Sequence, residues 1–179
     1  MRSIALPLAA IAAFVPALAG AADFTLSSKA LVDGVAPAQV SNAFGCTGGN
    51  VSPDLAWSGA PAGTKAFTLT LYDPDAPTGS GFWHWVVTDI PGDSTGLPAG
   101  AGEDADGIPG RGMRNDAGMR AYLGPCPPEG AGPHRYVFAL TALGVDHLDV
   151  PDDASAAIVG FMTGAHALGR AELTVTYGR

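Results

Sequence analysis

Two histidines, an aspartate and a tyrosine lie where strands are expected to begin or end. Asp73 follows an alternating apolar segment, His84 lies in an aromatic one, and His134 and Tyr136 begin a third, projecting from one face. An apolar core does not require such side chains, so each has a polar partner or faces a cavity. Around one opening they would form a small polar cavity for an anion, because imidazole and phenol groups donate hydrogen bonds. A neighbouring aspartate would favour the charged imidazole.

Prolines restrict the backbone beside these residues. In DPDAP (residues 73–77), prolines follow Asp73 and Ala76, so both residues favour extended geometry, and the Ala76–Pro77 bond is a candidate for the cis form. A second proline-rich segment, GPCPP (residues 124–128), precedes His134. Together these segments predict a rigid rim around a cavity, although each alone is equally compatible with a rigid surface turn.

Other site chemistries fit the sequence less well. Asp73, His84 and His134 are the residues that would bind a metal, but their spacing lacks an HxH or HxxxH pattern, so we expect no metal site. A serine hydrolase is disfavoured because no nucleophile elbow, a GxSxG motif between a strand and a helix, is evident. The glycine-rich segment 45–49 lacks the GK[ST] ending of a Walker loop. We therefore expect no cofactor.

Hydrophobic patterning predicts a β-rich α+β domain with several strands and one late helix. Alternation marks segment 66–72, and aromatic and β-branched residues mark segment 82–90. A regular strand there would place Trp83 and Trp85 on one face and His84 on the other. The expected strands are 24–28, 66–72, 82–90, 134–142 and 171–177.

The late helix is expected to begin near residues 151–153, with an aspartate as N-cap, and to end at Gly169 after running to about Leu168. The apolar residues expected to face the core are Ile158, Phe161, Met162, Ala165 and Leu168.

Residues 1–22 are typical of a secretory signal peptide, with an apolar stretch from Ile4 to Leu18 and small residues after it. We expect this segment to be removed, leaving residues 23–179 as one domain. A membrane anchor is disfavoured because Pro7 and Pro16 interrupt a stretch shorter than the ~20 residues that a span needs. No other stretch is apolar and long enough to span a bilayer.

Charge and cysteine content limit the partners and the compartment. Among 179 residues, Lys and Arg number 9 and Asp and Glu 17, so the net charge of −8 argues against nucleic acid and anionic membranes. Cys46 and Cys126 are the only cysteines, and in an exported chain we expect them to form a disulfide; two buried thiols are the alternative. A periplasmic or secreted location follows.

Three long motifs carry a family resemblance. LYDPDAPTGSGFWHWVV, RND at Arg114–Asp116 and GPCPPEGAGPHRYVFAL resemble the phosphatidylethanolamine-binding protein family, and most closely its bacterial Raf-kinase-inhibitor-like branch. The resemblance runs from about Phe24 to Arg179. It implies a large central β-sheet packed against a smaller sheet, with peripheral helices.

The resemblance also implies a ligand pocket for a phosphate-like group, with loop N–H groups near residues 124–127 facing the ligand and a cis proline at Pro77. Cys126 stands where eukaryotic members often have glycine, and Ala117 replaces an aromatic residue expected after RND. The ligand-binding residues predicted in this way are Asp73, Ala76, Pro77, His84, Gly124, Cys126, Pro127, His134 and Tyr136.

The function expected from these features is an exported, non-enzymatic binder of a small phosphate or carboxylate anion, or of a phospholipid head group such as phosphorylethanolamine. One alternative is a protein–protein regulator that inhibits a protease or kinase. A third is a phosphoester hydrolase that uses Asp73, His84 and His134 as acid–base groups, although no nucleophile is evident. The sequence leaves the oligomeric state open.

Overall fold

The computed structural model describes residues 23–104 and 107–179, which form two antiparallel sheets and one helix. The predicted signal segment lies outside the described residues. Within them, no helix has the length and apolar character to cross a membrane. The elements are β1 (Thr25–Ser27), β2 (Leu55–Ser58), β3 (Ala66–Asp73), β4 (Phe82–Pro91), β5 (Gly96–Leu97), β6 (Arg111–Met113), β7 (His134–Leu143), α1 (Ala156–His166) and β8 (Ala167–Tyr177).

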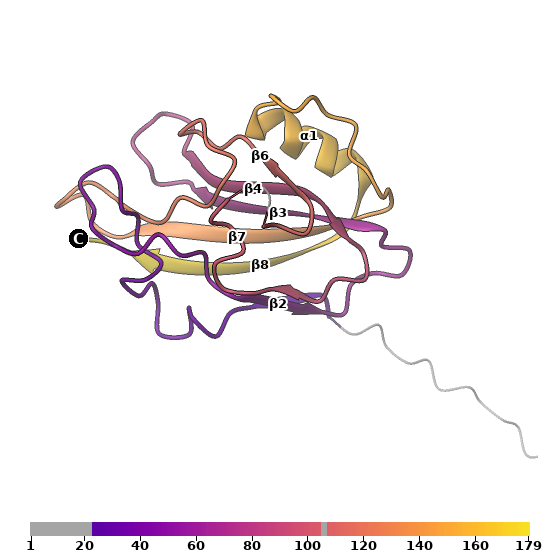
Figure 1. The fold of residues 1–179 in the computed structure, drawn as a ribbon, viewed down its shortest axis with the longest axis horizontal. Coiled ribbons are helices and arrows are strands. Elements are labelled where there is room, and N and C mark those ends of the chain that lie inside the picture. Colours follow the sequence, from indigo (N-terminus) through magenta and orange to yellow (C-terminus); the bar gives the residue numbers. More distant parts are fainter. Residues whose placement is uncertain (1–22, 105–106) are drawn as a thin grey trace, which may run out of the picture.

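Three layers build the domain. Figure 1 shows the five-stranded sheet, ordered β6-β4-β3-β7-β8, between α1 on one side and the three-stranded sheet β1-β2-β5 on the other. One apolar cluster, which includes Trp57, Phe67 and Trp85, fills the space between the sheets. A smaller cluster, which includes Val86 and Val159, lies between the large sheet and α1. The expected fold, a large sheet packed against a smaller one, is confirmed.

The three central strands match the prediction most closely. β3 pairs with both β4 and β7, and Leu69 lies opposite Val87 and Leu140 with none of the three exposed. Strands buried on both faces need apolar residues in nearly every position, and such runs are visible in the sequence. β8 begins at Ala167, four residues before the predicted start at Ala171, because the chain turns from α1 straight into the sheet.

A β-bulge at His84 overturns the predicted faces of β4. Leu71 pairs with Trp85 and Tyr72 with Trp83, so β4 carries one residue more than β3 between these pairs. Trp85 accordingly packs between the sheets, whereas Trp83 packs against the cluster beneath α1. The extra residue breaks the alternation of a regular strand and turns His84 toward Tyr136, with ring centroids 5.3 Å apart.

The predicted helix is present but shorter; of its predicted core-facing residues, Met162 packs against the cluster beneath α1, whereas Ile158, Phe161 and Leu168 are exposed. Its N-cap is Ser155, whose side chain accepts a hydrogen bond from Ile158 N. Ile158 is 50% exposed, Phe161 75% and Leu168 44%. The helix residues that face the sheet include Val159 and Thr163. The helix has apolar residues on all sides and no Asp, Glu, Lys or Arg, so periodicity does not distinguish its faces.

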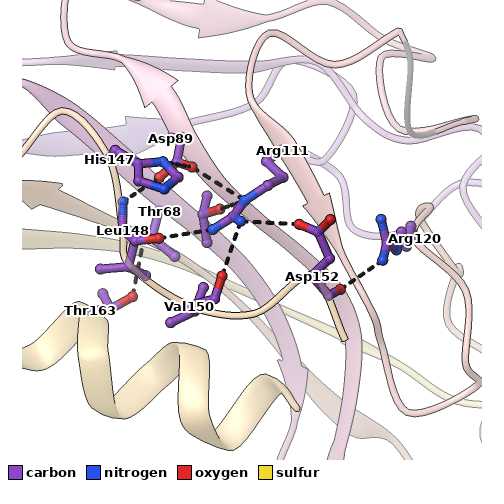
Figure 2. A network of polar contacts seen from close by, with 10 residues as sticks. Thr68, Asp89, Arg111, Arg120, His147, Leu148, Val150, Asp152 and Thr163 are labelled. Atoms are coloured by element: carbon purple, nitrogen blue, oxygen red, sulfur yellow. Dashed lines mark hydrogen bonds and ion pairs between the residues drawn. The ribbon is translucent and has the colours of Figure 1, made fainter. Parts of the chain in front are cut away.

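Arg111 on β6 fastens the segment that leads into α1 (Figure 2). Its guanidinium donates to Leu148 O at 2.9 Å and to Val150 O at 3.1 Å, and its Nε lies 3.3 Å from Asp89 Oδ2. The same Asp89 carboxylate accepts from Leu148 N and from His147 Nδ1. This network is structural, and it positions α1 against the sheet.

Candidate functional site

A cavity of about 560 Å³ opens where β3 ends and β4 and β7 begin. Antiparallel pairing brings these strand ends together, since Asp73 pairs with Phe82 across β3 and β4. The structure places all nine residues predicted from the sequence on its wall: Asp73, Ala76, Pro77, His84, Gly124, Cys126, Pro127, His134 and Tyr136. The sequence reasoning missed seven further lining residues: Phe44, Thr78, Phe82, Leu123, Pro128, Glu129 and Arg179.

A buried pair forms the base of the cavity. His134 Nδ1 lies 2.7 Å from Asp73 Oδ2, and the two residues are 5% and 3% exposed. The other carboxylate oxygen accepts the backbone N–H of Asp75 at 2.8 Å. Because Asp73 accepts at both oxygens, the His134 proton that faces it is on Nδ1. His134 Nε2 is then left for a ligand, as an acceptor in the neutral ring and as a donor in the charged ring.

Tyr136 supplies a buried donor that makes no hydrogen bond of good geometry to any described residue, although the Asp73 carboxylate lies near its hydroxyl. Its side chain is 0% exposed and lines the cavity. Burial, together with the negative charge of Asp73, raises the pKa of Tyr136 well above its ordinary value of 10.0. The hydroxyl therefore stays protonated. A buried polar group without a well-formed hydrogen bond is costly, and here a ligand would satisfy it.

His84 differs from the expectation of a charged imidazole. Burial lowers its pKa below the ordinary value of 6.5, and the hydrogen bond to Leu123 O and the charge of Asp73 offset only part of this effect. The ring is therefore neutral at neutral pH, and Nδ1 donates to Leu123 O at 3.0 Å. Its Nε2 carries a lone pair, so His84 presents an acceptor at the cavity wall.

The DPDAP segment is rigid, but not through a cis bond. The described residues contain no cis peptide bond, so the predicted cis Ala76–Pro77 bond is wrong. Asp75 instead binds Arg135 through both carboxylate oxygens and accepts the Arg135 backbone N–H. The hydrogen bond from the Arg135 side chain, with that from its backbone, holds the pKa of Asp75 well below its usual range. This contact ties the segment to β7 and keeps it in place beside the cavity.

A disulfide joins the loop around Cys46 to the segment 124–128, which lines the cavity. Cys46 and Cys126 are bonded, as predicted, and close a loop spanning 80 positions, which by chain entropy stabilises by about 4 kcal/mol. Gly124 N donates to Asn50 Oδ1 at 2.8 Å, so that N–H is not free to face an anion as expected. Cys126 N donates to no described residue and remains available.

Arg179 is the cationic residue that the sequence reasoning missed. Its Nε donates to Pro127 O at 2.7 Å, its Nη1 donates to Gly45 O at 3.2 Å, and Nη1 lies 3.5 Å from Glu129 Oε1. It lines the cavity while joining its two loops. No motif or spacing links this arginine to the strand starts, so only the folded chain brings it to the site.

Residues able to hold a metal ion are not gathered here: the described parts of the chain contain no group of three or more His, Cys, Asp or Glu side chains placed for one.

Comparison with known proteins places this chain in a family. A family model described as phosphatidylethanolamine-binding protein matches residues 28–178. The chain belongs to the phosphatidylethanolamine-binding protein family. Its relatives include the UPF0098 protein YbcL of Escherichia coli, which is 44% identical over 93% of this chain and 94% of YbcL. LppC of Mycobacterium tuberculosis, described as a candidate lipoprotein, is 38% identical over 86% of this chain and 71% of its own length.

Solved structures of family members share the fold. The crystal structure of Escherichia coli YbcL matches with a TM-score of 0.83, covering 88% of this chain and 99% of that one. CT736 of Chlamydia trachomatis, a candidate phosphatidylethanolamine-binding protein homologue, matches with a TM-score of 0.72 at 29% identity, covering 87% and 97%. The two-sheet architecture is therefore that of the phosphatidylethanolamine-binding protein family.

Proposed function

We propose that this family member is an exported, non-enzymatic binder of a small phosphate or carboxylate anion, which it holds in the cavity at the ends of β3, β4 and β7. The observation that carries the proposal is the hydroxyl of Tyr136, which is buried against the cavity and, with Asp73 nearby, still makes no hydrogen bond of good geometry to any described residue. A protonated hydroxyl in that position favours a ligand with acceptor oxygens, since it can donate a well-formed hydrogen bond to one of them.

The surrounding groups suit such a ligand. Arg179 places a positive charge on the wall, which the carboxylate of Glu129 3.5 Å away partly offsets, and the N–H of Cys126 adds a neutral donor. His134 donates from Nε2 when its ring is charged, in which case Asp73 balances that charge. The neutral ring of His84 accepts, which suits a ligand with a donor of its own, such as a singly protonated phosphate or an ethanolamine head group. The net charge of −8 therefore does not exclude a locally favourable anion site.

Binding is favoured over hydrolysis because the two strongest candidate nucleophiles in the cavity, Cys126 and Asp73, are already engaged in other contacts. The sulfur of Cys126 is bonded to Cys46. Both oxygens of Asp73 already accept hydrogen bonds, from His134 and Asp75. These contacts support positioning rather than attack on a phosphoester.

Export is supported by three features. The N-terminal sequence has the pattern of a signal peptide, the cysteines are paired, and one relative is described as a candidate lipoprotein. Cell fractionation of the full chain tests this part of the proposal. We expect the protein in the envelope or the medium, shortened by about two kilodaltons, and an uncut chain in the cytosol would contradict export.

Isothermal titration with inorganic phosphate, acetate and phosphorylethanolamine tests the anion site. We expect saturable 1:1 binding of at least one of these ligands, weakened by about tenfold or more in His134→Gln, because a charge-assisted hydrogen bond is lost. His166→Gln on α1 is the matched control and should bind as the wild type does. No binding at millimolar ligand would refute the proposal, and turnover of a phosphoester panel would favour the hydrolase.

A further inference from the structure

Phe44 has an unusual backbone and an unusual position. Its φ is 54°, in the left-handed region that bulky residues rarely adopt, and its side chain is 67% exposed. It also lines the mouth of the cavity. A strained backbone that holds a large apolar ring in water carries two costs in the free protein, and such sites concentrate where a ligand is held.

The backbone around Phe44 is fixed on both sides. Cys46 is bonded to Cys126 on the opposite wall, and its backbone N–H donates to Ala43 O at 3.0 Å. Arg179 Nη1 donates to Gly45 O at 3.2 Å. The Phe44 ring is therefore presented at the cavity mouth by a backbone that is already held before any ligand arrives, which lowers the entropic cost of binding.

The cavity divides into a polar base and an apolar rim. Its buried members include the polar side chains of Asp73, His84, His134 and Tyr136. Its exposed apolar members are Phe44, Pro77 and Pro128. A ligand that satisfies both parts has an anionic head group joined directly to an apolar group.

We infer that Phe44 is a specificity-determining residue whose ring packs on the apolar substituent of an organic phosphate or carboxylate. The preferred ligand is then an organic anion rather than inorganic phosphate. This inference rests on the proposed anion site and adds a second part to it. The base of the cavity binds the anionic head group, and Phe44 selects the apolar substituent joined to that group. Packing of two apolar groups at a rim is expected to change affinity by about three- to tenfold.

Methyl phosphate and phenyl phosphate test the inference, because both are monoesters and differ chiefly in the size of the apolar group. Isothermal titration of the full mature chain would compare wild type, Phe44→Gly and Phe44→Tyr. The glycine variant tolerates the positive φ and removes the ring, and the tyrosine variant retains the ring. Phe161→Ala is the matched control, since Phe161 is 75% exposed on α1.

The expected result is that wild type binds phenyl phosphate about three- to tenfold more tightly than methyl phosphate. Phe44→Gly should abolish this preference, whereas Phe44→Tyr and Phe161→Ala should keep it. An unchanged preference in Phe44→Gly, or none in wild type, would overturn the role of Phe44 while leaving the anion site intact. If neither monoester binds and inorganic phosphate, acetate and phosphorylethanolamine also fail to bind, the anion site itself is refuted, and the inference with it.

Discussion

His134 Nδ1 and Asp73 Oδ2 are 2.7 Å apart at the base of the cavity, and both side chains are almost wholly buried. The pair joins the last residue of β3 to the first residue of β7. In so little water, either side chain without the other leaves a polar group uncompensated. The pair therefore serves stability and fixes the orientation of the imidazole ring that lines the cavity.

The effects of Asp73→Asn and His134→Gln on the free energy of unfolding should be strongly coupled. Each change alone is expected to lower the free energy of unfolding by about 2–3 kcal/mol at neutral pH, because it leaves a buried partner unsatisfied. The double variant should be clearly more stable than the sum of the two losses predicts, as measured by urea denaturation.

The control cycle uses Asp75→Asn and Arg135→Gln. These changes break the exposed ion pair between Asp75 and Arg135, the residue that follows His134 in β7. The coupling in this cycle should be much smaller, because solvent screens both groups. Additive losses for Asp73 and His134 would show that their contact contributes no coupling.

The lowered pKa of His84 predicts that stability depends on pH. The unfolded chain takes up a proton at His84 near its ordinary pKa of 6.5, whereas burial delays this uptake in the folded chain. The unfolded state therefore binds more protons in this window, and the His84 contribution to stability is lost as pH falls below about 6.5. His84→Asn removes the titration while keeping a donor for Leu123 O.

Urea denaturation between about pH 7 and pH 5 measures this effect. The wild type should lose stability more steeply toward low pH than His84→Asn does. His166→Asn, at a partly exposed position on α1, should retain the wild-type slope. A slope unchanged in His84→Asn would show that His84 titrates alike in the folded and unfolded chain.

Arg111 should matter for stability and not for the ligand. Arg111→Met removes donors to Leu148 O and Val150 O and the contact with Asp89, so the free energy of unfolding should fall by about 2 kcal/mol. Arg120→Met, which loses one hydrogen bond to Asp152 O, should cost less. Phosphate affinity at low temperature should stay at the wild-type value in both variants, and a selective loss of affinity in Arg111→Met would link this network to the cavity.

The central strands were predictable because burial on both faces forces apolar residues into consecutive positions. The bulge at His84 was not, since it depends on one residue gained relative to β3 and leaves no mark in composition. The buried face of α1 was predicted only in part, through Met162, because Phe161 and Val159 are equally apolar and only packing against the sheet decides between them.

The residues of the site likewise divide into those that the sequence predicts and those that only the folded chain reveals. Asp73, His134 and Tyr136 stand out in the sequence because polar residues interrupt apolar strands. Phe44 and Arg179 do not, since an isolated phenylalanine in a glycine-rich loop and an arginine after the last strand are common surface residues. The disulfide and the hydrogen bond from Arg179 to Gly45 O bring them to the cavity, and these contacts exist only in the folded chain.

Tyr136→Phe tests the central claim most directly, with Tyr122→Phe as its matched control. Tyr122 Oη donates to Gln39 O at 2.9 Å, so its loss should lower the free energy of unfolding by about 1–2 kcal/mol. Tyr136 Oη makes no hydrogen bond of good geometry to the described residues, so its removal should leave stability unchanged or raise it by about 1 kcal/mol.

The decisive measurement is the phosphate affinity of these two variants by isothermal titration. We predict that Tyr136→Phe binds about tenfold more weakly than wild type while remaining at least as stable, and that Tyr122→Phe binds as wild type does. Wild-type affinity in Tyr136→Phe would contradict the claim that its hydroxyl is held in the cavity for an anion.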